Sequence, residues 1–181
     1  MTAPKLSLAD VRLATEADIP AVRALMDAAI AGLLPAFLPP DAVAASYAVM
    51  GLDTQLIADR TYFLIEIGGV AAACGGWSHR ATLFGGDHSA GRDAALLDPA
   101  TEPARVRAMY THPDFTRRGL GRLILAACED AARTAGFRRA QMAATMAGVP
   151  LYEACGYRAD EPFASVVGEV AVPLLRMSKA L

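Results

Sequence analysis

Cysteine and histidine are scarce in this sequence, which argues against a disulfide-stapled or metal-binding protein. The three cysteines fit no metal-ligand spacing and are odd in number, so we expect free thiols in a reducing compartment. The three histidines show no i, i+4 pairing, so we expect no metal site. These residues are Cys74, Cys128, Cys155, His79, His88 and His112.

The sequence also lacks a charge excess, a long hydrophobic run and a secretion signal. Its formal net charge of −2 gives no overall attraction to nucleic acid or to an anionic membrane. No apolar run approaches the length of a membrane span, and the first residues lack a charged-then-apolar pattern. We therefore expect a cytoplasmic protein that binds neither nucleic acid nor membrane.

What is present is a chain rich in alanine and aliphatic side chains. Hydrophobic residues make up 54% of the 181 residues, which predicts a folded globule rather than a disordered chain. This length suits one domain with its own core, so we expect residues 1–181 to form a single domain.

One stretch, Arg105 to Gly136, organises the rest of the chain. Its pattern predicts a strand, a turn rich in glycine and arginine, and an amphipathic helix. Pro113 stops the strand, and Gly136 can end the helix. The strand alternates Val106, Ala108 and Tyr110 with Arg105, Arg107 and Met109, and the apolar helix face is predicted to hold Leu120, Leu123, Ile124, Ala127, Cys128, Ala131 and Ala135.

The turn between this strand and helix has the features of a phosphate site. A helix start exposes unpaired N–H groups and carries partial positive charge. Gly119 and Gly121 let another group approach the backbone, and Arg117, Arg118 and Arg122 add full charge. The alternative is a plain strand-to-helix turn with solvated arginines.

The glycine spacing distinguishes between phosphate-binding motifs. A dinucleotide fingerprint needs a third glycine where this chain has Ile124, and a P-loop needs a lysine that the turn lacks. The turn instead resembles the acetyl-CoA-binding motif of the GNAT superfamily of N-acetyltransferases, Gln/Arg-x-x-Gly-x-Gly/Ala. Gly119 and Gly121 match that motif, while Thr116 stands where Gln or Arg is usual.

A second stretch, from Met146 to Tyr157, resembles the second GNAT motif. Pro150 can open a short helix and Gly156 can close it. In the family this helix carries a tyrosine that protonates the departing CoA thiolate, and Tyr152 matches it. The family's usual asparagine is absent, and Ala147 takes its place.

The resemblance implies a fold, a reaction and a set of site residues. It implies an α/β fold with a central mixed sheet of about six to seven strands and about four helices. It implies direct transfer of an acetyl group from acetyl-CoA to a primary amine, with the backbone N–H of Met109 or Tyr110 as oxyanion donor and Tyr152 as acid. The residues expected to bind the coenzyme are Met109, Tyr110, Thr111, Thr116, Arg117, Arg118, Gly119, Leu120, Gly121 and Arg122.

The remaining chain is predicted from periodicity and turn residues. Adjacent Gly75 and Gly76 inside a strand predict a bulge or a close approach. Glu129 and Arg133 are spaced for an ion pair on an exposed helix face. The other predicted elements are strands at 10–15, 61–67, 70–77, 137–144 and 170–177 with Pro173 at an edge or bulge, and helices at about 19–32, 40–50 and 150–156.

The acceptor side of the site is the least specified by the sequence. We expect Phe37, Trp77 and His79 to contact the acceptor, helped by an irregular stretch at 78–103 that also offers Asp87 and His88. The acceptor could be a small amine, an amino acid, a peptide terminus or a protein lysine, and a homodimer is open. A non-catalytic acetyl-CoA-binding module and a fold that binds a different phosphate are the alternatives. No residue of the central strand offers a general base.

Overall fold

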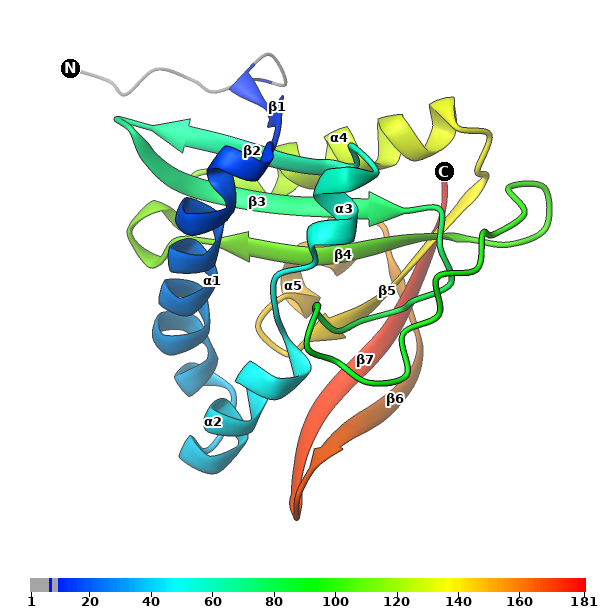
Figure 1. The fold of residues 1–181 in the computed structure, drawn as a ribbon. Helices are drawn as coiled ribbons and strands as arrows, with labels where there is room; N and C mark the ends of the chain where they lie inside the picture. Colours follow the sequence, from blue (N-terminus) through cyan, green and yellow to red (C-terminus); the bar gives the residue numbers. More distant parts are fainter. Residues whose placement is uncertain (1–6, 8–9) are drawn as a thin grey trace.

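The computed structural model describes residue 7 and residues 10–181, which form a seven-stranded mixed sheet with five α-helices (Figure 1). The strand order is β1-β2-β3-β4-β5-β7-β6, which confirms the expected mixed sheet. The helices are α1 (Ile19–Leu33), α2 (Pro40–Val49), α3 (Thr54–Ala58), α4 (Leu120–Thr134) and α5 (Val149–Ala154); the strands are β1 (Arg12–Leu13), β2 (Tyr62–Ile67), β3 (Val70–Ser78), β4 (Ala104–Thr111), β5 (Arg139–Thr145), β6 (Arg158–Val167) and β7 (Val170–Ala180).

Helix α1 covers one face of the sheet, with α4 on the opposite face (Figure 1). By length and composition alone, the helical stretch Glu16–Ala36 could span a membrane, with 21 residues and a mean hydropathy of 1.4. We expected no such run. Its apolar side chains Val22, Leu25 and Ile30 are buried against the sheet, as in the core helix of a globular fold.

The two adjacent glycines of β3 accommodate a β-bulge, as the sequence predicted. The pairing of β3 with β4 shifts register between Cys74 and Gly76, and Ala108 on β4 has a left-handed φ of 52°. A side chain at Gly75 would overlap the side chain of Met109. Glycine is therefore needed where the two strands approach most closely.

The bulge also reverses the faces of β4, so the predicted alternation of this strand is wrong. Val106 packs with the α4 side of the sheet, whereas Ala108 and Tyr110 pack in the cluster beneath α1. Arg107, expected on the same face as Met109, is turned inward and its side chain is only 3% exposed. One extra residue changes the face of everything that follows it.

Strands β4 and β5 are parallel, as expected for a strand-helix-strand unit around α4. They pair at only two positions, Ala104 with Ala140 and Arg105 with Gln141. Beyond these pairs the strands diverge, with α5 below the gap (Figure 1). This divergence leaves the second half of β4 without a partner on its β5 side.

The buried face of α4 is rotated from the predicted one. Leu125, Glu129 and Ala132 are buried, while Ala135, expected to be apolar-facing, is exposed. Glu129 pairs with Lys179 of β7 at 2.8 Å and lies 3.5 Å from Arg133. The predicted Glu129–Arg133 pair exists, but its carboxylate is buried rather than on an exposed face.

The chain ends in a long hairpin, where the sequence predicted only one strand. Strand β6 is mostly exposed and carries no apolar alternation, which explains why it was missed. Strand β7 inserts between β5 and β6. Pro173 lies beyond the last β5–β7 pair, Thr145 with Leu174, so β7 pairs there with β6 alone, and proline is tolerated at that edge.

Candidate active site

Two cavities open on either side of the β4 bulge and meet at shared residues. The first, the Arg107 cavity, has a volume of about 60 Å³; the second, the Thr111 cavity, has about 110 Å³. Both are lined by Met50, Met109, Tyr110, Thr145 and Tyr152. The Arg107 cavity adds Val49, Gly51, Leu83, Phe84, Gly85, Val106, Arg107, Ala108, Met142, Ala143 and Leu174; the Thr111 cavity adds Ala29, Ile30, Leu33, Leu34, Thr111, Ala147 and Gly148.

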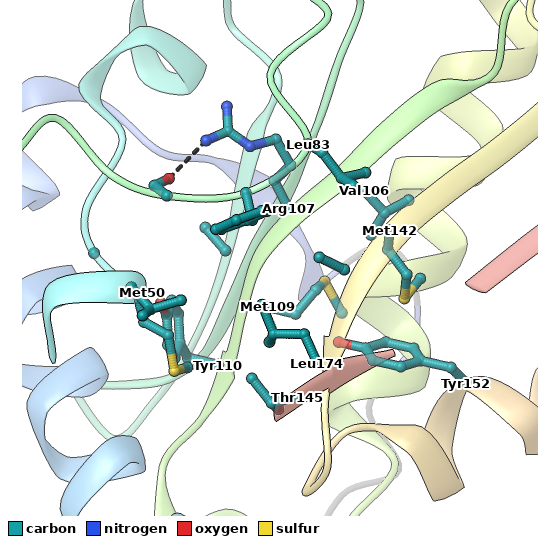
Figure 2. A pocket seen from close by; sticks show the side chains of 16 residues that line it. Met50, Leu83, Val106, Arg107, Met109, Tyr110, Met142, Thr145, Tyr152 and Leu174 are labelled. Carbon is teal, nitrogen blue, oxygen red and sulfur yellow. Dashed lines mark hydrogen bonds between the residues drawn. The ribbon is translucent and has the colours of Figure 1, made fainter. Parts of the chain in front are cut away.

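Tyr152 lies at the junction of the two cavities. It comes from α5, which Pro150 helps to start, and its hydroxyl points into the cavity (Figure 2). Burial raises the pKa of Tyr152 well above its ordinary value of 10.0. No described residue hydrogen bonds to this hydroxyl. Gly148 packs against the Tyr152 ring so closely that a Cβ at this position would lie 2.6 Å from a ring carbon. The hydroxyl is thus protonated and available to a ligand.

The bulge of β4 presents unpaired backbone at the same junction. Within the described chain, Ala108 and Met109 have no residue partner in either β3 or β5. Tyr110, by contrast, is paired with Cys74 of β3. Of the two N–H groups expected as oxyanion donors, that of Met109 is the one the strand pairing leaves unused.

A buried tyrosine holds the bulge from behind. The Tyr62 side chain is 1% exposed, and its hydroxyl donates to the carbonyl oxygen of Ala108 at 2.9 Å. The same hydroxyl lies 3.2 Å from Cys74 Sγ. The sequence gave no signal for this contact, because the residues are 46 positions apart.

The turn before α4 has the predicted geometry. Gly119 is the N-cap of α4 with a φ of 82°, and a Cβ there would meet open space. In the described chain, the backbone N–H groups from Arg117 to Arg122 donate to no backbone carbonyl, so they form a run of free donors. Arg118 stacks 4.9 Å from the Phe115 ring, and the Thr116 hydroxyl turns back to Pro113.

A buried network of ion pairs holds the Arg107 side chain in place. Asp53, whose side chain is fully buried, contacts Arg107 Nη1 and Arg92 Nη2, each at 2.5 Å. Arg107 also donates to the carbonyl oxygen of Gly85 at 2.6 Å (Figure 2). Burial lowers the pKa of Arg107, and the charge of Asp53 opposes that effect. The network ties β4 to the stretch at 79–103.

The irregular stretch at 79–103 does reach the cavity, but through different residues than expected. Leu83, Phe84 and Gly85 line it. His88 instead contacts the Ala48 carbonyl at 3.0 Å, and Asp87 pairs with a neighbouring arginine and a helix N–H. The polar residues of this stretch therefore hold it in place, while its apolar residues face the cavity.

The three side chains predicted to contact the acceptor line neither cavity, so these contacts stay predictions. Trp77 is buried against Phe137 and His79, with ring centroids 5.9 Å apart in each case. His79 lies beside Asp59 at 3.7 Å. Phe37 is 49% exposed after the turn that follows α1.

Sequence reasoning found some site residues and missed others. The cavities bring together Met109, Tyr110, Thr111 and Tyr152, whereas the predicted turn residues 116–122 line neither cavity. Arg107, Leu83 and Met50 were missed, since each reaches the site through long-range packing. Among the described residues, no group of three or more His, Cys, Asp or Glu side chains is placed to hold a metal ion.

The features present fit a thioester of coenzyme A. A run of free N–H groups with arginines beside it suits a diphosphate. The gap between β4 and β5 and the Thr111 cavity suit a narrow pantetheine arm, and this cavity leads to Tyr152.

Comparison with solved structures finds the same architecture. A GCN5-related N-acetyltransferase from Rhodopseudomonas palustris superposes with a TM-score of 0.69 at 16% identity, covering 100% of this chain and 99% of that one. The PaiA N-acetyltransferase from Thermoplasma acidophilum in complex with coenzyme A gives 0.64 at 8% identity, covering 94% and 98%. YncA, a putative acetyltransferase from Salmonella typhimurium with acetyl-CoA, gives 0.63 at 18%, covering 94% and 92%.

The identities to these structures are low, so the likeness shows the fold alone. A search of curated proteins finds no match. The sequence itself matches the Acetyltransferase (GNAT) family over residues 25–157, which is most of the chain. The match spans the β4 bulge, the glycine turn and the helix of Tyr152 described above. The chain therefore belongs to the GNAT family of acetyltransferases.

Proposed function

We propose that this protein transfers an acetyl group from acetyl-CoA directly to the primary amine of an acceptor held in the Arg107 cavity. The observation that carries the proposal is the meeting of two cavities at Tyr152 and the β4 bulge. A thioester entering from the Thr111 cavity and an amine entering from the Arg107 cavity would come together there. Direct transfer then needs no covalent acetyl-enzyme.

The coenzyme side of the reaction rests on main-chain donors. Bound acetyl-CoA supplies the acetyl group as an activated thioester. The N–H groups from Arg117 to Arg122 hold its diphosphate, with Gly119 and Gly121 removing side chains from the approach. Complexes of PaiA with coenzyme A and of YncA with acetyl-CoA support this assignment by analogy of fold.

Two groups act on the reacting atoms. The Met109 N–H donates a hydrogen bond to the thioester oxygen as negative charge develops on it. The Tyr152 hydroxyl donates its proton to the departing sulfur, whose thiol has an ordinary pKa of about 8.5, and the proton that the attacking amine loses restores the hydroxyl. Burial raises the pKa of Tyr152, so the hydroxyl keeps its proton throughout the neutral range. The same burial also destabilises the thiolate anion and so raises the pKa of the CoA thiol. The pKa of the proton donor and that of the proton acceptor therefore rise together.

The direct test is the variant Tyr152→Phe, assayed by release of the free CoA thiol. We expect kcat to fall about 100-fold, because a positioned acid contributes roughly that much, while the Kd of acetyl-CoA stays within about twofold. Tyr47→Phe removes an exposed hydroxyl and serves as the control. A Tyr152→Phe enzyme with wild-type kcat would contradict the assignment.

The second candidate is a non-catalytic acetyl-CoA-binding module. It is favoured by the lack of any carboxylate or imidazole among the described residues that line the two cavities. A wild-type protein that binds acetyl-CoA in a calorimeter, yet releases no thiol with any amine of a broad panel, would favour the module over the enzyme.

A further inference from the structure

The lining of the Arg107 cavity has an unusual balance of charge and hydrophobicity. Most of it is apolar, and the side chains that line it include Met50, Met109, Met142, Leu83 and Leu174 (Figure 2). Among the described residues that line it, none is acidic and none is a histidine. The cavity therefore offers an ammonium group no carboxylate partner.

Among the described residues, Arg107 is the one ionised side chain in that lining, and its charge is already paired with a carboxylate. Both of its Nη atoms are engaged, by Asp53 and by the carbonyl oxygen of Gly85. Asp53 lies behind Arg107 with a fully buried side chain, so it is turned toward the network and not toward an acceptor. A cationic acceptor would meet a paired arginine and apolar walls.

We infer that the acceptor is a weakly basic primary amine carried by an apolar group, such as the α-amine of an amino-acid amide or peptide with an apolar side chain. This inference rests on the proposed function. An α-amine with a pKa near 7.7–8.0 is about one-fifth to one-third neutral at pH 7.4, whereas a lysine ε-amine with a pKa near 10.4 is about one-thousandth neutral. A cavity whose described lining offers no carboxylate to pair with an ammonium group therefore favours the amine that is more often neutral.

The first experiment compares two acceptors that each carry one primary amine. Leucinamide offers an α-amine, and Nα-acetyl-lysinamide offers an ε-amine on a longer stem. We expect kcat/KM at pH 7.4 to favour leucinamide by at least about 100-fold, as the neutral fractions predict. Equal or better use of the lysine probe, or of spermidine, would overturn the inference.

A pair of variants on the same loop tests whether the cavity wall sets the preference for leucinamide, or whether the pKa of the amine alone does. Leu83→Asp places a carboxylate in the cavity wall and should narrow the preference for leucinamide at least tenfold. Leu96→Asp adds the same charge to a side chain that is 69% exposed and outside the cavity, and should leave the preference unchanged. An unchanged ratio in Leu83→Asp would contradict the inference.

Calorimetry with acetyl-CoA distinguishes failure of the acceptor inference from failure of the proposed function. If acetyl-CoA binds and other amines of the panel are acetylated but leucinamide is not, the inference about the acceptor is wrong. If acetyl-CoA binds and no amine is acetylated, the proposed function is wrong. If acetyl-CoA does not bind at all, the proposed function is wrong.

A second and independent observation concerns Tyr62. Its hydroxyl donates to the carbonyl oxygen of Ala108, and this carbonyl belongs to the same peptide group as the Met109 N–H. A hydrogen bond to one end of a peptide group fixes its plane and polarises the N–H at the other end. Ala108 also holds a left-handed φ of 52°, which a non-glycine residue adopts only when its surroundings enforce it.

We propose that Tyr62 is a positioning residue for the oxyanion donor, acting through the Ala108–Met109 peptide and resting on the proposed function. Burial raises the pKa of Tyr62 well above its ordinary value, so the hydroxyl stays a donor. In Tyr62→Phe we expect kcat to fall about tenfold while the Kd of acetyl-CoA remains within about twofold.

The test includes a spectroscopic signature that a purely structural role would not move. In the infrared spectrum of bound acetyl-CoA labelled with ¹³C at its thioester carbonyl, the carbonyl band should lie at higher frequency in Tyr62→Phe than in the wild type. Cys74→Ala removes the other contact of the hydroxyl and should leave both kcat and the band unchanged. An unshifted band with unchanged kcat in Tyr62→Phe would overturn the proposal, whereas loss of acetyl-CoA binding by the wild type would overturn the proposed function.

Discussion

The two walls of the cleft are built in different ways. The coenzyme wall, where we propose that acetyl-CoA binds, is one continuous stretch, residues 104–122, in which strand, turn and helix start follow one another. The wall of the Arg107 cavity is assembled from segments far apart in the sequence, at 49–51, 83–85, 106–110, 142–145 and 174 together with Tyr152. Local rules of turns and caps fix the first wall, whereas the second depends on how the whole chain packs.

The walls also differ in how they satisfy charge. The coenzyme wall leaves its N–H donors open, and Arg117 and Arg118 beside them are exposed. Behind the Arg107 cavity, two arginines, Arg92 and Arg107, are paired with two carboxylates, Asp53 and Asp87. The coenzyme wall therefore favours an anion, whereas the wall of the Arg107 cavity offers its ligand no unpaired charge.

The largest effect is expected from breaking the network of the second wall. Asp53→Ala leaves Arg107 buried without its carboxylate, and should lower the free energy of unfolding by about 3–5 kcal/mol. Urea unfolding measures this loss. Glu66→Ala breaks an exposed pair with Arg12 and should cost less than about 1 kcal/mol. Equal losses in the two variants would refute the view that the network holds the wall.

The next effect concerns the coenzyme wall. Gly119→Asp places a negative charge at the start of α4 and should weaken acetyl-CoA binding about 30-fold, or roughly 2 kcal/mol. Gly168→Asp is a matched control, because Gly168 also has a positive φ and open space around it but lies in the β6–β7 turn. Calorimetry should show weaker binding in the first variant alone; a matching loss in the second would point to strain instead.

A smaller effect is expected where the walls meet. Gly148 has an ordinary φ of −85°, so Gly148→Ala adds no backbone strain, but its Cβ would displace the Tyr152 ring. We expect kcat to fall about tenfold. In the Tyr152→Phe background the same change should add little, because both changes act through one hydroxyl. Additive losses in steady-state kinetics would show that Gly148 acts by another route.

The smallest effect concerns the core that both walls share. Burial raises the pKa of the Cys74 thiol to about 12 from an ordinary 9.0. Below pH 9 both states keep the proton; above it the unfolded chain loses the proton while the folded chain retains it, so stability falls as pH rises. Between pH 8 and 9.5 Cys74 should account for a loss of about 0.8 kcal/mol. Thermal melts of Cys74→Ala should show a shallower decline, and an identical slope would argue against it.

The sequence predicted the parts of the molecule that local chemistry determines. The β4-turn-α4 unit, the paired glycines of β3 and the helix that carries Tyr152 all follow from turn residues and short-range periodicity. Family resemblance added the role of Tyr152, which remains a proposal.

The parts that the sequence did not predict share one physical cause. The bulge at Ala108 turned Arg107 inward. A bulge adds one unpaired residue to a strand, and the alternation of polar and apolar residues in the sequence does not reveal where that happens. Glu129 was read as exposed because nothing in α4 indicates that Lys179 covers it. Helix α3 is too short and β6 too exposed to leave a pattern. In each case a distant segment, rather than the local sequence, decides which way a side chain faces or whether an element forms.

The most direct test of the account is a crystal structure of the protein with coenzyme A. The account predicts a diphosphate within hydrogen-bond distance of the backbone N–H groups between Arg117 and Arg122. It also predicts the sulfur in contact with the Tyr152 hydroxyl, at the point where the two cavities meet. Coenzyme A bound elsewhere, or a sulfur on the far side of α5 from this hydroxyl, would contradict it.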